Sequence, residues 1–203
     1  MNYRLQDIMK MIIPGLYLMA LVLGYEILYS DFDIDTSKLK DLSAIVVLLI
    51  PFVGFVSGYF VECITAGLEH GWYALGGRRP SKNILAGSSM YPVAYIENIK
   101  TEHQIANGNI SNDTANEILQ TAKQSIPNKE VVEPYRNNAA LARNIFGSQL
   151  LFTVLLAVLL DDFYIEVYWY LSLVALLAFF GYWMHHNHVY VKYVLAEYAK
   201  SLS

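Results

Sequence analysis

The chain has 203 residues, of which 55% are hydrophobic and 16% charged, and its mean hydropathy is +0.33. Soluble domains carry about a quarter charged residues, so this composition excludes an ordinary soluble enzyme and a disordered tail. The single cysteine, Cys63, excludes an internal disulfide and therefore a secreted disulfide scaffold. The net charge of −4 is too small to indicate a basic or acidic partner for the whole chain.

Four apolar blocks account for the low charge. Each approaches the roughly 20 residues that cross about 30 Å of hydrocarbon at about 1.5 Å per residue. The predicted spans are residues 11–29, 42–60, 145–160 and 167–184. We therefore expect one all-α membrane domain, residues 1–203, in which four transmembrane helices form a bundle and extend into a small cytoplasmic helical head.

The first block contains an ionisable residue, Glu26. Ionisable side chains are costly inside a bilayer, so they are functional candidates there by default. Glu26 either lies at the interface beside Tyr25 and Tyr29 or lines a pore or an ion site.

The second block carries Gly54 and Gly58, a small-xxx-small pattern that lets two helices approach closely. Pro51 is expected to kink this helix and to free a backbone carbonyl. This face packs within one subunit, packs between subunits, or acts as a hinge. Glu62, at the end of the block, pairs with an arginine or belongs to a pore path.

Residues 62–143 form a polar insertion that is patterned as helix. Apolar spacing predicts that the second span continues to Leu75. Thr114 and Glu117 form a capping box that predicts a short helix ending at Ser125. A longer helix is expected to begin near Pro134 and to run into the third span.

Basic residues set the expected orientation. Twelve of the fourteen lysines and arginines lie in residues 1–10, 62–143 and 185–203. The loop between the first two spans holds four aspartates and two lysines, and the loop at residues 161–166 holds three acids and no base. Because basic loops stay cytoplasmic, we expect both termini and the insertion on the cytoplasmic side of the membrane.

Polar residues in the third span are further pore candidates, or they bond a neighbouring helix. They are Ser148, Gln149 and Thr153.

Arginines of the insertion are candidates for binding a ligand or a partner. They are Arg78, Arg79, Arg136 and Arg143. Arg136 and Arg143, seven residues apart, share a helix face and suit the phosphates of a nucleotide, RNA or lipid headgroups. Alternatively, these two arginines only anchor the third span by the positive-inside rule.

His185, His186 and His188 follow the fourth span. His185 and His188 share a helix face, but no cysteine or carboxylate pair lies nearby, so no metal and no cofactor is assigned. A cluster that responds to pH is the stronger interpretation. The chain shows no phosphate-binding loop, catalytic triad or carboxylate dyad, so we do not expect an enzyme. A lipid enzyme would require these histidines to meet His70 and His103.

The second span ends in Gly58-Tyr-Phe60 and Glu62, and Gly76-Gly-Arg-Arg-Pro-Ser81 follows. With a helical insertion between two pairs of spans, this layout resembles small multi-pass membrane proteins encoded beside bacterial anti-phage genes, such as the four-span accessory protein of type VI-B CRISPR loci. The resemblance implies a membrane-localised effector or modulator of an RNA-guided defence nuclease, and it carries over no site residues.

The leading hypothesis is an oligomeric inner-membrane protein that forms or gates a pore, or perturbs the bilayer, in response to a cytoplasmic signal. The expected partners are the lipid bilayer, further copies of the chain, and a soluble defence protein, RNA or nucleotide. The alternative is a non-conducting scaffold that recruits a soluble partner through residues 62–143.

Overall fold

The computed structural model describes residues 5–29, 43–75, 77, 79–87, 96–105, 110–158 and 163–202. These residues form helices, and none of them is in a strand. The helices are α1 (Leu5–Tyr29), α3 (Ser43–Ala74), α4 (Pro80–Leu85), α5 (Ile96–Glu102), α6 (Asn112–Ser125), α7 (Lys129–Val158) and α8 (Phe163–Ser201). The prediction of an all-helical chain is confirmed.

Four helices are long and apolar enough to cross a membrane, which agrees with the four predicted spans. The stretches that qualify are Ile8–Ile27, Leu49–Ala74, Lys129–Val158 and Val167–Ser201. α3 ends one residue before the predicted stop at Leu75, and α7 and α8 run far beyond their apolar blocks. The acidic loop at residues 31–41, the positions Asp161 and Asp162, and Arg78 lie outside the described residues.

The chain packs as two units. One, here named the apolar unit, comprises Met1–Gly67 and Ala140–Trp183, and the other, the polar unit, comprises Leu68–Ala139 and Met184–Ser203. Three long helices, α3, α7 and α8, contribute residues to both.

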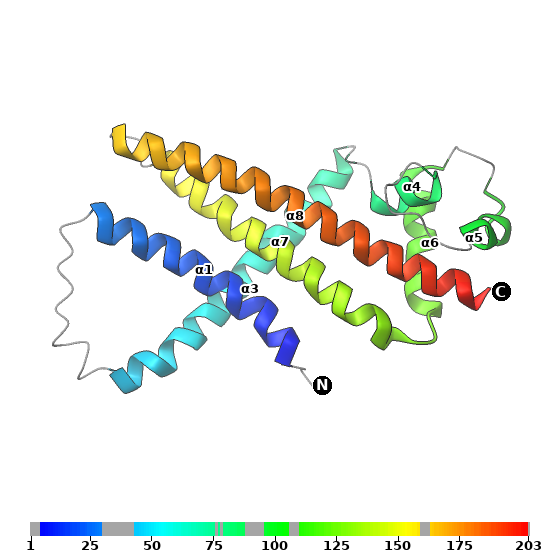
Figure 1. The fold of residues 1–203 in the computed structure, drawn as a ribbon, viewed down its shortest axis with the longest axis horizontal. Coiled ribbons are helices and arrows are strands. Elements are labelled where there is room, and N and C mark those ends of the chain that lie inside the picture. The colour runs from blue at the N-terminus through cyan, green and yellow to red at the C-terminus, as the bar shows by residue number, and fades with distance from the viewer. Residues whose placement is uncertain are drawn as a thin grey trace. The chain divides into compact units, whose positions relative to one another are not determined.

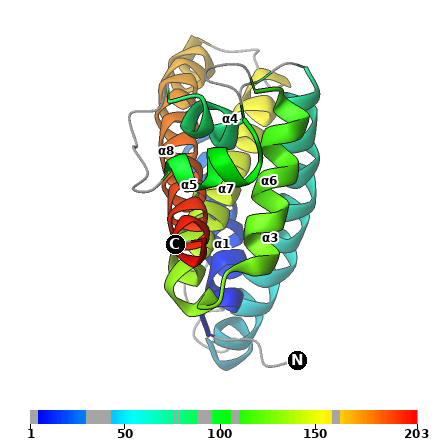
Figure 2. The same cartoon turned by 90° about the vertical axis from the view of Figure 1, so that its right-hand side faces the viewer.

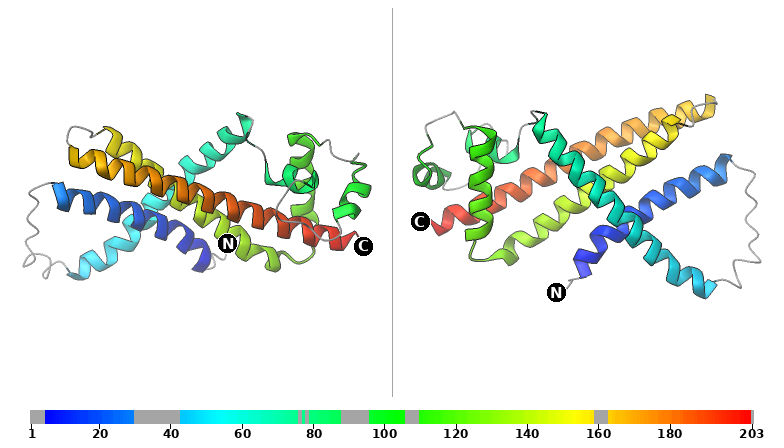
Figure 3. Two further views of the ribbon diagram at one scale, coloured as in Figure 1. Left: turned by 45° about the horizontal axis from the view of Figure 1, so that its top comes forward. Right: turned by 180° about the vertical axis from the view of Figure 1, so that it is seen from behind.

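Glycines let α1 cross α3 at close range within the apolar unit (Figure 1). A Cβ on Gly15 would collide with the carbonyl oxygen of Gly54, and one on Gly58 would collide with the carbonyl oxygen of Met11. A tilted view and a view from behind both show the crossing of the blue and cyan helices (Figure 3). Small residues at the contact bring the two backbones together, as at other membrane helix pairs.

α7 and α8 run antiparallel in the apolar unit and share aromatic contacts (Figure 1). The ring of Phe146 stacks on Trp183, with 5.4 Å between centroids, and also contacts Phe180 at 5.6 Å. Tyr17 of α1 meets the edge of Phe179 at 5.9 Å.

The polar unit has its own hydrophobic core. α4, α5 and α6 gather beside the C-terminal part of α8 (Figure 2). The buried core side chains come from these helices, from the start of α7 and from the end of α8; they include Leu85, Ile99, Ile118, Val132, Val194 and Leu195.

The capping box predicted at Thr114 is wrong by three residues. α6 begins at Asn112, and its N-cap is Ser111, whose hydroxyl accepts a hydrogen bond from the Thr114 backbone N–H at 3.0 Å. Ser111 and Thr114 have the spacing of an N-cap and its N3 position, so Thr114 lies inside the helix and donates its backbone N–H to the cap.

Candidate functional site

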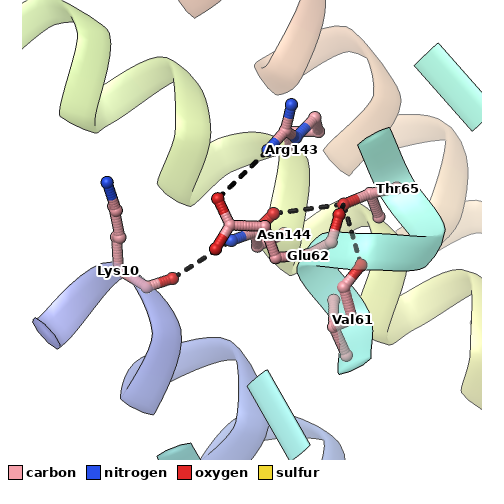
Figure 4. Close-up of polar contacts among 6 residues, drawn as sticks. All are labelled: Lys10, Val61, Glu62, Thr65, Arg143 and Asn144. Carbon is pink, nitrogen blue, oxygen red and sulfur yellow. Dashed lines mark hydrogen bonds and ion pairs between the residues drawn. The ribbon is translucent and has the colours of Figure 1, made fainter. Parts of the chain in front are cut away.

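Polar side chains of α7 bind the other helices of the apolar unit. Asn144 is fully buried, and its amide nitrogen donates to the carbonyl oxygen of Lys10 in α1 at 3.2 Å. Its amide oxygen accepts from the hydroxyl of Thr65 in α3 at 3.1 Å (Figure 4). One side chain therefore connects three helices.

The bond from Asn144 to Lys10 compensates for a proline. Pro14 has no N–H, so the carbonyl four residues earlier, at Lys10, loses its donor within the helix. The Asn144 amide supplies a replacement donor from α7. One turn further on, the buried Ser148 hydroxyl donates to the Pro14 carbonyl at 2.9 Å.

Gln149 and Thr153 connect α7 to α8 and α1. The Gln149 amide nitrogen donates to the Ser172 hydroxyl at 2.7 Å, and its amide oxygen accepts from the Tyr17 hydroxyl. The Thr153 and Ser172 hydroxyls lie 2.7 Å apart. Hydrogen bonds of this kind hold membrane helices together where no water competes for them.

An ion pair lies beside this network. The Arg143 guanidinium and the Glu62 carboxylate approach within 3.5 Å, and both side chains are largely shielded (Figure 4). Of the residues considered for a pore, Ser148, Gln149 and Thr153 are buried inside one chain, Glu62 is paired with Arg143, and Glu26 is exposed on α1.

The glycine pattern of α3 contacts α1 within the same chain. Gly54 and Gly58 are both buried there, whereas Pro51 is exposed. Two glycines that the sequence analysis did not single out complete the packing. Gly15 faces Gly54 from α1, and Gly147 of α7 leaves room for the methyl group of Thr65.

The polar unit contains a cavity of about 330 Å³ between α6, α7 and α8. Its polar lining consists of three cations, one carboxylate and one phenol: Lys123, Lys129, Arg136, Glu133 and Tyr190. Its apolar lining consists of Ile126, Val132 and Val194, all of which belong to the core of this unit. A cavity with an apolar floor and a few convergent charges is the usual form of a small-molecule site.

The charges of the cavity are not balanced. Arg136 pairs with Glu133 at 3.4 Å, while Lys123 lies over the Tyr190 ring at 5.6 Å from its centroid. Burial lowers the pKa of the Lys123 ammonium; Glu69 opposes this shift and Arg79 adds to it. Burial thus disfavours the charged form of Lys123, and a bound anion would favour it.

Arg79 has a different place in the polar unit. Its guanidinium lies over the Tyr73 ring at 4.8 Å and donates to Asn116 at 3.2 Å. Asn187 donates to the Tyr73 hydroxyl at 2.8 Å. This cluster connects α3, α6 and α8, so Arg79 contributes to the packing of the unit.

The histidines do not converge on one site. His188 contacts the Met184 carbonyl at 2.8 Å, and His103 lies 3.1 Å from the Tyr198 hydroxyl. The rings of His185 and His186 meet edge to face at 5.3 Å. No group of three or more potential metal-ligating side chains occurs within the part of the chain that the structure describes.

Sequence reasoning selected Arg136 but missed most of the cavity, including Lys123, Lys129 and Tyr190. One signal was available, because Lys129, Val132, Glu133 and Arg136 follow the three- and four-residue spacing of one helix face. The contributions of α6 and α8 depend on tertiary packing. Arg143, seven residues after Arg136 on α7, does not line the cavity and pairs with Glu62.

No family model, curated protein or solved structure matches this chain.

Proposed function

We propose that the protein is a membrane effector or modulator that responds to an anionic signal bound by its polar unit. The observation that supports this proposal is the cavity with three cations and one carboxylate. Two of the helices that line it, α7 and α8, also supply apolar residues suited to crossing a membrane. On the orientation predicted from the basic residues, the cavity faces the cytoplasm of a bacterium.

A ligand in the cavity would act on the spacing of α7 and α8. Tyr135 of α7 and Tyr193 of α8 stack with 3.7 Å between ring centroids, which holds the two helices together in the polar unit. Binding shifts a conformational equilibrium only when the ligand favours one arrangement. An anion that draws Lys129 and Arg136 of α7 toward Lys123 of α6 supplies that preference.

The effect on the bilayer requires more than one chain. The polar side chains of the third span bond helices inside a single chain, and large apolar side chains are exposed around them. Any polar lumen would therefore lie between subunits, so we propose self-association. Following the resemblance stated above, we further propose that the setting is anti-phage defence.

The mass of the full chain in lipid nanodiscs tests self-association, and ion flux from reconstituted vesicles tests the effect on the bilayer. We expect a discrete oligomer, and a flux that differs between the wild type and a Lys129→Gln/Arg136→Gln variant. A strict monomer in vesicles as tight as protein-free ones would contradict the proposal.

That outcome would favour the alternative, a non-conducting scaffold. One observation supports it: Leu68 and Trp72 on α3, and Leu75 directly after the helix, are all exposed. The scaffold predicts that a soluble partner co-purifies with the wild type and is lost with Trp72→Ala.

A further inference from the structure

The cavity between α6, α7 and α8 has a size that restricts its ligand. At about 330 Å³ it lies near the lower end of the roughly 300–1,000 Å³ found for small-molecule sites. It therefore has the size for one small molecule.

The charges of the lining restrict the ligand further. Lys123, Lys129 and Arg136 line the cavity together with one carboxylate, Glu133, so the lining itself has an excess of positive charge; the Glu69 carboxylate, outside the lining, also interacts with Lys123. A phosphate monoester carries about −1.5 to −2 at neutral pH and offers three acceptor oxygens. It matches this excess better than a single carboxylate does, and Arg136 provides the planar guanidinium that binds phosphate oxygens in pairs.

The uncharged lining residues indicate what the part of the ligand beyond its phosphate is like. Ile126, Val132 and Val194 are apolar, and Tyr190 presents an aromatic ring. The three aliphatic side chains are already almost wholly buried in the core, so the surface left for a ligand is mainly the partly exposed ring of Tyr190. A molecule with a flat or apolar body would cover this ring, whereas inorganic phosphate would not.

We infer that this cavity binds a phosphate monoester with an aromatic or apolar body, the chemistry shared by nucleoside monophosphates and monoester lipids. The inference deepens the proposed function, because it names the chemical class of the anionic signal. Lys129, Arg136 and Lys123 bind the phosphate, and Tyr190 contacts the body.

The position of the lining along its helices favours the soluble source. On α8, Tyr190 lies six residues, or about 9 Å, beyond Met184, where the polar-unit residues of that helix begin. On α7, Lys129 and Arg136 lie eleven and four residues, or about 16 and 6 Å, before Ala140, where the apolar-unit residues begin.

Calorimetric titration of the full chain in phosphatidylcholine nanodiscs tests the inference, with adenosine monophosphate, adenosine and inorganic phosphate as probes. We expect adenosine monophosphate to bind at least about tenfold more tightly than either fragment, a difference of about 1.4 kcal/mol. Binding should also weaken as ionic strength rises.

Variants with opposite expected effects distinguish a binding role from a structural one. Lys129→Gln and Arg136→Gln each remove a cation from an exposed side chain and should weaken binding about fivefold to tenfold. Glu133→Gln removes the carboxylate that competes for Arg136 and should tighten binding. Lys200→Gln, an exposed lysine on α8 outside the cavity, is the matched control and should bind like the wild type.

A second titration, with a phosphate-monoester lipid in the nanodisc, distinguishes a nucleoside monophosphate from a lipid as the ligand. Nanodiscs that contain phosphatidic acid should leave the affinity for adenosine monophosphate unchanged. If phosphatidic acid binds in a way that depends on Arg136 and adenosine monophosphate does not bind, the soluble source is overturned in favour of a lipid phosphate.

If none of the phosphate probes binds, or if all variants behave alike, the inference fails. The flux experiment still tests the proposed function in that case, because a signal of a different chemical class could change the ion flux through the protein. Binding without any flux would support the inference and contradict the proposed function.

Discussion

Asn144 connects three helices of the apolar unit. It is fully buried, and it supplies a hydrogen-bond donor to the Lys10 carbonyl that Pro14 leaves without one. Serine and asparagine in membrane helices usually pack or bond to a neighbouring helix. Here the amide also replaces a missing backbone N–H, which makes α1 depend on α7.

A double-mutant cycle tests this dependence. Asn144→Ala should destabilise the protein by about 1–2 kcal/mol, because two interhelical hydrogen bonds are lost from a dry site. In a Pro14→Ala background the loss should be smaller, because the new backbone N–H can donate to Lys10. The measurement is thermal unfolding in detergent, read as a coupling energy.

Asn138→Ala is the matched control, since Asn138 is exposed on the same helix. Strict additivity between Pro14→Ala and Asn144→Ala would show that the two positions do not act on the same carbonyl.

At the scale of helices, the crossing of α1 and α3 has almost no free space. Gly15 and Gly58 each lie against backbone atoms of the other helix, which cannot move aside as a flexible side chain would. A substitution here therefore forces the helices apart and loses the packing along the whole crossing.

Gly58→Ala is expected to destabilise the protein by about 1–3 kcal/mol, because its Cβ would collide with the Met11 carbonyl. Gly67→Ala on the same helix meets no atom within 4 Å and should be tolerated. Unfolding temperatures of the two variants give the comparison. Equal temperatures would mean that α1 and α3 do not cross at these glycines in the bilayer.

The sequence predicted the helices better than it predicted their contacts. The length of the apolar blocks identified the four apolar helices, and the pattern of the insertion correctly predicted that α7 begins well before the third block, although at Lys129 rather than near Pro134. The pairing of Asn144 with Lys10 spans 134 residues, and no local pattern encodes it. Lys123 and Tyr190 were missed for the same reason, since packing alone places α6 beside α8.

At the scale of the whole molecule, the orientation of the chain in the membrane determines from which compartment the cavity can bind a ligand. The predicted arrangement, with both termini in the cytoplasm, follows from basic residues near the ends of the apolar blocks. It can be tested without reference to any ligand.

Cysteine labelling in intact bacteria makes that test. In a Cys63→Ala background, we expect a membrane-impermeant maleimide to label Ser37→Cys, in the acidic loop, and to leave Ser201→Cys unlabelled until the cells are broken. The reverse pattern would invert the topology and place the cavity outside the cytoplasm.

The exchange of a backbone donor for a side chain also has a consequence for how the chain is made. α1 is synthesised first, yet its substitute donor at Asn144 follows 134 residues later. At about 5–20 residues per second, roughly 7–27 s of translation separate the two. Throughout that interval the Asn144 amide is not available to the Lys10 carbonyl, so the first helix reaches its final set of hydrogen bonds only after the third apolar helix has been made.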